Sequence, residues 1–379
     1  MLFVKREDLK TGMRLARPIY NNNGVLLFER NSKLTQQGIE SIRNFGLIGI
    51  FVLEPAEPVP PMTQDDIEFE RFQTMCVFSI QEELDKIIQT KRASKMQMIA
   101  SNIIKNYGHL EKKINFVQNL RSKEDYIYKH SLNVAILSAM MTHVLNLKVD
   151  EQLETVQAAI IHDIGKMMMP KSIMEKDEWT DADQAVARTS EIAGFDLIDI
   201  VYSSSPNIKR ICAQAQKALE SLETGEDISA MKMVNGAKVL AVAEKFDTMT
   251  AMQFGKEPVS EVTALRHLME NPQIYDSQVV NALVQSINIL SPGVSVELNT
   301  SEKALVITAN ERNILQPMVL MFRDNSIIDL SNETMYGDLQ IKDIMKTMDN
   351  RHVMDVDMLK KSGVQVETPK FVEVPGSQD

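Results

Sequence analysis

The sequence predicts a multidomain protein in which an all-α helical bundle is flanked by a small N-terminal α+β unit and a C-terminal β-rich unit. Three observations support this fold class. The chain has 379 residues, which is more than one domain usually contains. From Asp65 to Pro292 apolar residues recur at intervals of three and four, a pattern typical of amphipathic helices. After Pro292 the pattern changes to short alternating or apolar runs bounded by Asn, Ser and Asp, which is typical of strands.

The first 55 residues predict the small mixed unit. The runs "MRLARPIY" and "VLLFE" predict two strands joined by an Asn-Asn-Asn-Gly turn, because Asn and Gly tolerate positive φ. The stretch "SKLTQQGIESIRNFG" predicts a helix with Thr35 as its N-cap and Gly46 at its end, and "IGIFVLEP" predicts a closing strand. Four prolines follow between Glu54 and Met62. Proline fixes φ and lacks an N–H donor, so residues 56–64 are expected to form a semi-rigid linker.

The C-terminal part predicts a four-strand β unit, with strands in "VSVELN", "ALVITA", "QPMVLMF" and "SIIDL". The stretch "IKDIMKTMD", residues 341–349, predicts a short helix after these strands. We therefore expect six segments: the small unit 1–55, the linker 56–64, a helical connector 65–118, the helical bundle 119–292, the β-rich unit 293–362 and a loose tail 363–379.

Charge and composition exclude several classes of function. Lys plus Arg number 41 and Asp plus Glu number 52, which gives a net charge of −11. We therefore expect no DNA or RNA partner, because nucleic-acid binding needs a basic surface. The two cysteines, Cys76 and Cys212, are too few for a metal quartet and are expected to be reduced core residues. The N-terminus lacks the apolar core of a signal peptide, and no apolar run approaches the roughly 20 residues of a membrane span, so a cytoplasmic protein is expected.

An adjacent histidine and aspartate, His162 and Asp163, lie within the apolar run "AAIIHDIGK". Helical spacing places Asp163 on the same face as Val156 and Ile160, so its carboxylate is expected to point inward. A buried carboxylate is costly unless it is paired or bound to a metal. Gly165 is expected to end the helix directly after the pair, and a helix C-terminus favours a cation. The pair therefore predicts part of a metal site.

His130 and Glu244 are the expected further ligands. His130 shares a helical face with Val134, so its ring is expected to point inward. The helix in "GAKVLAVAEKFDTMTA" offers two acids, Glu244 and Asp247, and Glu244 shares a face with Leu240. Such mixed nitrogen and oxygen donors suit Fe, Mn, Zn or Mg, and we expect at most one divalent ion. The expected ligand set, contributed by three helices, is His130, His162, Asp163 and Glu244.

The motifs "HSLNVA" and "AAIIHDIGK" and an acid after "VLAVA" occur in this order. On these motifs the chain resembles the HD superfamily of metal-dependent phosphohydrolases, and more closely its HD-GYP subfamily of bacterial cyclic di-GMP phosphodiesterases. The stretch "PKSIMEKDEWTDAD" adds to the resemblance, which covers about Lys123–Pro292. The resemblance implies an HD/HD-GYP bundle, a metal-dependent phosphodiesterase chemistry and a cyclic dinucleotide ligand. In such a site Asp163 and Lys166 are the expected catalytic residues, with Lys166 contacting phosphate oxygens.

The chain also departs from the HD-GYP pattern. The His-Pro of active members is replaced by Thr189-Ser190, and the His-His-Glu region, residues 213–216, reads Ala-Gln-Ala-Gln. No histidine occurs between His162 and His267, and the Gly-Tyr-Pro loop is absent, so ligands for a second metal are missing. Glu244 stands for an Asp, and Gln253-Phe254-Gly255 stands for an Arg-Pro-Tyr. What remains is the single-metal set of the wider HD superfamily.

Three hypotheses of function remain open. The first is a degenerate HD-GYP module that acts as a signalling or regulatory protein in cyclic di-GMP pathways, with catalysis lost or impaired. Its partners would be a cyclic dinucleotide, other signalling proteins or a second copy in a homodimer. The second is a single-metal phosphohydrolase that hydrolyses a phosphodiester such as cyclic di-GMP. The third is a purely structural protein-interaction domain in which His162 and Asp163 only cap their helix.

Overall fold

The computed structural model describes residues 2–20, 25–44, 49–53, 63–116, 125–174, 176, 179–228, 230–251 and 259–344. The chain divides into two compact units. One comprises Met1–Met75 and Leu290–Asp379, and the other comprises Cys76–Ile289. The predicted linker, the predicted helix end at Gly46, the segment Gln253-Phe254-Gly255 and the predicted tail fall largely or wholly outside the described residues.

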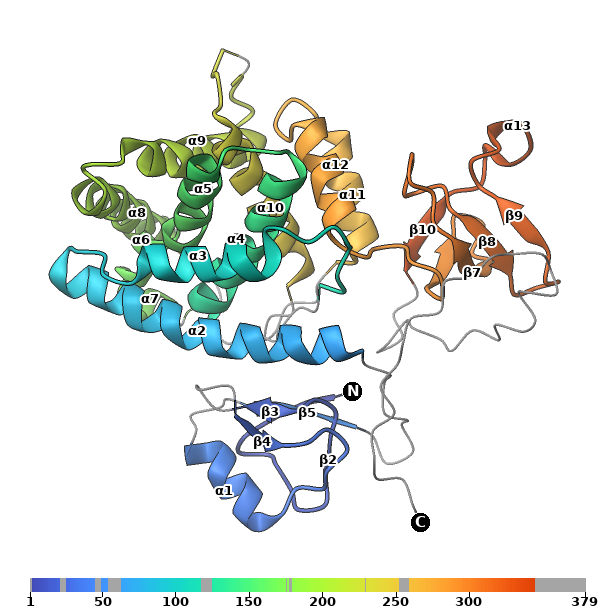
Figure 1. Cartoon of the computed structure of the whole chain (residues 1–379), viewed down its shortest axis with the longest axis horizontal. Helices are drawn as coiled ribbons and strands as arrows, with labels where there is room; N and C mark the ends of the chain where they lie inside the picture. The colour runs from blue at the N-terminus through green and yellow to red at the C-terminus, as the bar shows by residue number, and fades with distance from the viewer. Residues whose placement is uncertain are drawn as a thin grey trace. The chain divides into compact units, whose positions relative to one another are not determined.

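All the secondary-structure elements in the described part of the Cys76–Ile289 unit are helices, which confirms the all-α prediction (Figure 1). Residues with apolar side chains at helical spacing form these elements because each helix buries one face against its neighbours. The helices are α2 (Gln64–Thr90), which begins in the other unit, α3 (Met96–Tyr107), α4 (Tyr126–Val144), α5 (Val149–Ile161), α6 (Ile164–Met167), α7 (Lys171–Met174), α8 (Asp181–Val201), α9 (Pro206–Thr224), α10 (Asn235–Thr250), α11 (Glu261–Glu270) and α12 (Ser277–Ser286).

Helix α4 is the centre of this unit. Every residue from His130 to Thr142 is buried, so the helix has no solvent-facing side over more than three turns. It packs against α3, α5, α10 and α12, and α5 and α10 also contact each other. Burial of one Val or Leu side chain in such a core contributes roughly 1.5–3 kcal/mol. The helices α4, α5 and α10 therefore form a fixed frame, and the expected metal ligands lie in α4, in α10 and directly after α5.

Helices α6 and α8 approach each other more closely than side chains would allow. A Cβ atom on Gly194 of α8 would lie 2.6 Å from the Cα of Gly165 in α6. A Cβ atom on Gly165 would lie 2.8 Å from the Cα of Glu191. The prediction that Gly165 ends a helix was wrong, because α5 ends at Ile161 and Gly165 lies inside α6. Because Gly165 has no side chain, α8 can approach it closely; the glycine does not end a helix.

The N-terminal residues form two small antiparallel sheets and one helix. Strands β1 (Leu2–Lys5), β5 (Gly49–Leu53) and β2 (Arg14–Leu15) form one sheet in that order. Strands β3 (Ile19–Tyr20) and β4 (Leu26–Phe28) pair with each other, and the predicted Asn-Asn-Asn-Gly turn between them lies outside the described residues. The hydroxyl of Thr35 accepts the N–H of Gly38 at 3.0 Å, which supports its predicted role as the N-cap of α1 (Gln36–Asn44). The apolar core of these elements includes Leu15, Leu34, Ile42 and Val52.

The C-terminal residues form one antiparallel sheet with the strand order β10-β6-β7-β8-β9. The four predicted strands are present as β6 (Ser295–Leu298), β7 (Lys303–Thr308), β8 (Met318–Met321) and β9 (Ile327–Asp329), with the short helix α13 (Glu333–Tyr336) after them. The predicted helix at 341–349 was wrong for its described part. Residues Ile341–Ile344 form β10, because the free edge of β6 offers backbone hydrogen bonds to an extended chain.

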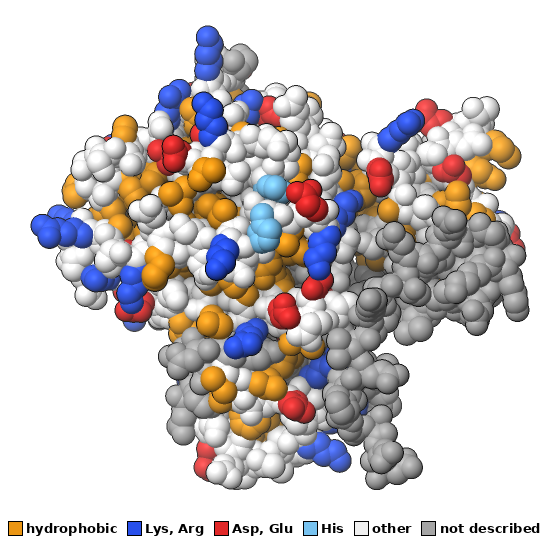
Figure 2. Space-filling view, in the orientation of Figure 1, with side chains coloured by type: hydrophobic (Ala, Val, Ile, Leu, Met, Phe, Trp, Pro, Cys, Tyr) orange, Lys and Arg blue, Asp and Glu red, His pale blue; other side chains and the backbone are white. Residues whose placement is uncertain are grey.

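The distribution of charged side chains and of cysteines bears on the expectations from composition. In the face shown in Figure 2, Lys and Arg side chains are scattered among acidic and apolar ones and form no single basic patch. Both cysteines are free and buried, and burial raises the pKa of the Cys76 thiol to about 12. Within the described residues, no helix combines the length and the hydrophobicity needed to cross a lipid bilayer.

Candidate metal centre

The structure brings together the four side chains that the sequence proposed as ligands. His130 comes from α4, His162 and Asp163 follow the end of α5, and Glu244 comes from α10. One potential ligand atom from each side chain lies within 4.8 Å of all the others. Residues separated by up to 114 positions in the sequence therefore meet at one point, which is the arrangement that coordination of a single ion requires.

The end of α5 sets the orientation of His162. Its backbone N–H closes the last helical turn on the carbonyl of Ala158 at 2.8 Å. The ring Nδ1 lies 2.9 Å from the carbonyl oxygen of Ala159, which can only accept, so Nδ1 carries the hydrogen. The ring then presents Nε2, without its hydrogen in the neutral form, to Glu244 Oε2 at 2.9 Å. This is the tautomer that can donate a lone pair to a metal.

Asp247 fixes the second histidine in the same way. Its Oδ2 lies 2.6 Å from His130 Nδ1, and its Oδ1 accepts a hydrogen bond from Asn133 Nδ2 at 3.1 Å. The opposite nitrogen, His130 Nε2, lies 2.5 Å from Glu244 Oε2. The sequence offered Asp247 as an alternative acid, but in the structure it holds the ligand His130 from behind. Carboxylates behind histidine ligands are common in metal sites, where they fix the ring and raise its basicity.

Charges within the site stabilise one another despite burial. Burial opposes the charged form of His130, but the carboxylates of Glu244 and Asp247 raise the pKa of this ring well above its ordinary value. Burial likewise opposes ionisation of Glu244, but the two histidine rings hold the pKa of this carboxyl well below its usual range. Glu244 is therefore a carboxylate in the folded protein, and a cation placed between it and the two rings would replace the proton on the imidazole.

Lys166 lies beside the ligand Asp163. Its Nζ is 2.7 Å from Asp163 Oδ2, three residues earlier in the chain. Burial opposes the charged amine, but Asp163 and Glu244 raise the pKa of Lys166 above its ordinary value. Burial also opposes ionisation of Asp163, and Lys166 with His162 lowers the pKa of its carboxyl. The expected catalytic pair thus meets as an ion pair, with a permanently charged ammonium group at the mouth of the site.

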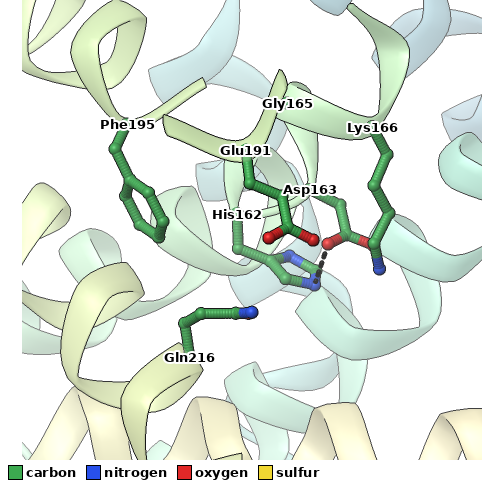
Figure 3. A pocket seen from close by; sticks show the side chains of 7 residues that line it. All are labelled: His162, Asp163, Gly165, Lys166, Glu191, Phe195 and Gln216. Carbon is green, nitrogen blue, oxygen red and sulfur yellow. Dashed lines mark hydrogen bonds and ion pairs between the residues drawn. The ribbon is translucent and has the colours of Figure 1, made fainter. Parts of the chain in front are cut away.

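A small pocket opens onto this centre and is walled on its far side by α8 and α9. Its lining includes His162, Asp163, Lys166, Glu191, Phe195 and Gln216 (Figure 3). The sequence patterns pointed to neither Glu191 nor Phe195. Their signal was weak, because a carboxylate and an aromatic ring four residues apart also occur on ordinary surface helices. The helices that would carry the histidines of a second metal site instead present the carboxylate of Glu191, the ring of Phe195 and the amide of Gln216 to the pocket.

The donor set fits one divalent ion. It contains two imidazole nitrogens and two carboxylates, and both histidine rings are oriented by hydrogen bonds on their Nδ1 side. Zinc, iron and manganese accept such mixed nitrogen and oxygen sets. The residues near the centre that belong to α8 and α9 supply no histidine, so the described residues provide one such ligand group.

Parts of this chain are similar to known proteins. Residues 114–279 match the family model of the HD domain. The chain is 24% identical over 204 residues to the cyclic di-GMP phosphodiesterase PA4108 of Pseudomonas aeruginosa, a match that covers 54% of this chain and 49% of that protein. It is also 24% identical over 224 residues to the cyclic di-GMP phosphodiesterase PdeB of Borreliella burgdorferi, covering 55% of this chain and 56% of that protein.

The chain thus spans about half the length of the curated relatives that it matches. Among solved structures, Bd1817, an HDGYP protein from Bdellovibrio bacteriovorus, aligns with a TM-score of 0.42 and 13% sequence identity, covering 74% of this chain and 97% of that one.

Proposed function

We propose that this chain, which carries an HD domain over residues 114–279, is a degenerate HD-GYP regulatory module of cyclic di-GMP signalling. Its site holds one divalent ion and binds the phosphate of a cyclic dinucleotide, and its phosphodiesterase activity is lost or impaired. The observation that carries the proposal is the contrast across the pocket. Four ligand atoms converge on one side within 4.8 Å, whereas the opposite wall lacks the histidines that a second ion would need.

The ligand side supports binding of an ion and a phosphate. His130, His162, Asp163 and Glu244 would hold the ion, and Asp247 would keep the ring of His130 in place. A bound divalent ion would supply positive charge to neutralise a phosphate oxygen. Lys166 would donate to a second phosphate oxygen, because its ammonium group lines the pocket beside Asp163.

The opposite wall supports the loss or impairment of catalysis. Phosphodiester hydrolysis by two-metal sites relies on a pair of ions that stabilise the attacking and the leaving oxygens. Here the region around Thr189-Ser190 contributes Glu191 to the pocket, and the region 213–216 contributes Gln216. Gln214 is engaged elsewhere, since its amide bonds the backbone of Lys232 and Val234. This wall therefore offers one carboxylate and one amide but no imidazole, which is fewer nitrogen donors than a second histidine-rich metal site would need.

The test is metal content, nucleotide binding and hydrolysis measured on the same protein, purified without oxygen. The wild type is compared with the double variant His162→Ala, Asp163→Ala. The double variant His143→Ala, Glu111→Ala serves as a matched control, because it removes one histidine and one acid from an exposed pair that are 3.2 Å apart. We expect about one ion per chain in the wild type and the control and none in the first variant. We also expect cyclic di-GMP to bind without turnover.

A second candidate function is a single-metal phosphohydrolase, which the retained Lys166–Asp163 pair favours. Metal-dependent turnover of cyclic di-GMP by the wild type, lost in the His162→Ala, Asp163→Ala variant, would select this candidate over the first. Absence of both metal and nucleotide from all three proteins would select the structural interaction domain instead. The three outcomes are therefore distinct in the same set of measurements.

A further inference from the structure

The first residue of helix α4 lies against one of the expected metal ligands. Tyr126 is four residues before His130, so the two side chains share one side of the helix. Their rings are stacked, with centroids 5.4 Å apart and planes 17° from parallel, which is a favourable offset arrangement of two rings. His130 is fully buried, whereas Tyr126 is partly exposed. The phenol ring therefore covers one face of the imidazole at the start of α4.

The stack restrains the imidazole in a way that its hydrogen bonds do not. His130 Nδ1 lies 2.6 Å from Asp247 Oδ2, and Nε2 lies 2.5 Å from Glu244 Oε2. These two contacts fix the positions of the nitrogens, but the ring can still tilt about the line that joins them. The tilt matters for a metal site, because the lone pair of Nε2 lies in the plane of the ring. A nearly parallel ring against its face opposes this tilt.

The ring of His162, which also lies beside His130, cannot provide the same restraint. Its centroid is 5.3 Å from that of His130, but the two planes are inclined by 57°. An inclined ring touches the imidazole with one edge and leaves the plane of the imidazole free to rock against it. Of these two neighbouring rings, Tyr126 is therefore the one that can fix the plane.

Tyr128, which belongs to the same first turn of α4, shows a different role for the same residue type. Its hydroxyl donates to Asp85 Oδ1 of α2 at 3.2 Å. Residues two positions apart on a helix point in different directions, so Tyr128 joins α4 to α2 while Tyr126 faces the ligand. The two tyrosines thus separate the general anchoring of this turn from the contact with His130.

We propose that Tyr126 is a positioning residue of the metal centre, which holds the plane of the His130 imidazole in the orientation that binds a divalent ion. This inference rests on the proposed function, because it concerns the ion that the four ligands would hold. Tyr126 gives no atom to the ion and acts through His130. A ligand that is already oriented loses less freedom when the ion binds, so the stack raises the affinity for the ion.

Titration of the full chain with Co²⁺, followed by visible absorption, tests this inference, because the spectrum reports both affinity and coordination geometry. Tyr126→Leu and Tyr126→Met remove the aromatic ring, and Tyr126→Phe keeps it. Tyr128→Leu is the matched control, since it removes a tyrosine ring from the same turn and leaves the stack in place. Urea unfolding of each metal-free protein measures the stability that each change costs.

We expect Tyr126→Leu and Tyr126→Met to bind Co²⁺ about 2- to 10-fold more weakly than the wild type, because one stacking interaction is lost. Their absorption bands should also shift, since the imidazole meets the ion at a different angle. Tyr126→Phe should keep the affinity and the spectrum of the wild type. Tyr128→Leu should lower the urea midpoint and leave both the affinity and the spectrum unchanged.

Two results would overturn the positioning role of Tyr126 alone. The first is wild-type affinity and spectrum in a folded variant that lacks the ring, either Tyr126→Leu or Tyr126→Met. The second is an equal loss of affinity in Tyr128→Leu, which would mean that any loosening of the first turn of α4 weakens the site. Failure of the wild type to bind Co²⁺ would instead overturn the metal centre of the proposed function.

Discussion

The two walls of the pocket differ in what their side chains can do. On the first wall His162 and Asp163 line the pocket, and they meet the other two expected ligands, His130 of α4 and Glu244 of α10. Each histidine is held by a hydrogen bond on its Nδ1 side. On the wall formed by α8 and α9, the pocket is lined by Glu191, Phe195 and Gln216, and the side chains there make few bonds to one another. The side chains of the first wall are joined by hydrogen bonds, whereas those of the second wall can still bond to a ligand.

This difference indicates that the two walls are under different physical constraints. Removing one member of a connected, buried polar network leaves its partners unsatisfied, which is costly for stability. Replacing a partly exposed residue such as Glu191 leaves little unsatisfied, so this wall can change its chemistry at small cost. A protein could therefore lose a second metal site without losing the first, and the following predictions test this asymmetry.

The largest effect is expected for Asp247→Ala on the connected wall. This change removes the partner of His130 Nδ1 and of Asn133 Nδ2 in a site with no exposure to solvent. We expect the free energy of unfolding to fall by about 3–5 kcal/mol and the affinity for a divalent ion to fall by about 10- to 100-fold. Urea unfolding and metal titration measure the two effects. Asp247→Asn, which keeps one acceptor, should lose less, and an unchanged urea midpoint in Asp247→Ala would contradict the assignment.

The next effect concerns the length of the acid in the ligand set. Glu244 Oε2 lies 2.5 Å from His130 Nε2 and 2.9 Å from His162 Nε2. Glu244→Asp shortens the side chain by one bond of about 1.5 Å, which exceeds the roughly 0.5 Å tolerance of a ligand constellation. We expect about tenfold weaker binding of the ion in a competition titration with a chelator. Tighter binding in this variant would mean that the backbone of α10 stands closer to the ion than we infer.

Gly165→Ala should act on the open wall through the backbone. The added Cβ would meet Glu191 Cα at 2.8 Å, so α6 and α8 must separate. Such overpacking costs about 1–3 kcal/mol of stability. Metal content should persist, whereas the affinity for cyclic di-GMP should drop, because the wall that α8 contributes to the pocket moves away from Asp163 and Lys166. Ala185→Gly on the exposed face of α8 controls for a general weakening of the helices, and equal nucleotide affinity in both variants would count against this coupling.

The smallest effect is expected when the pH is lowered and Asp183, at the start of α8, is protonated. The Lys176 ammonium and the bonds from Thr180 lower the pKa of Asp183 from its ordinary value to about 2. A carboxyl with a lowered folded pKa adds stability above its unfolded pKa near 3.9, and this stability is lost as the pH falls toward 2. In Lys176→Ala the thermal midpoint should therefore lie slightly below that of the wild type at pH 6, and the two should converge near pH 2. A difference that stays constant across this range would contradict the linkage.

The sequence was enough to predict the helical bundle, its flanking β-rich parts and the four expected ligands that the structure brings together. Helical periodicity was sufficient for these predictions, because a repeat of 3.6 residues indicates which face of a helix is buried. His130, Asp163 and Glu244 lie on such faces. The order of the motifs then indicated the family whose domain model the chain matches over residues 114–279.

Which neighbour each buried face meets depended on the tertiary structure. It turned Ile341–Ile344 from an expected helix into a strand on the edge of β6, and it gave Asp247 the role of holding His130. It also placed Glu191 beside Asp163 through a contact between two glycines. The physical reason is the same in each case: local sequence sets the preference of one segment, whereas pairing and packing depend on the backbone of a distant one.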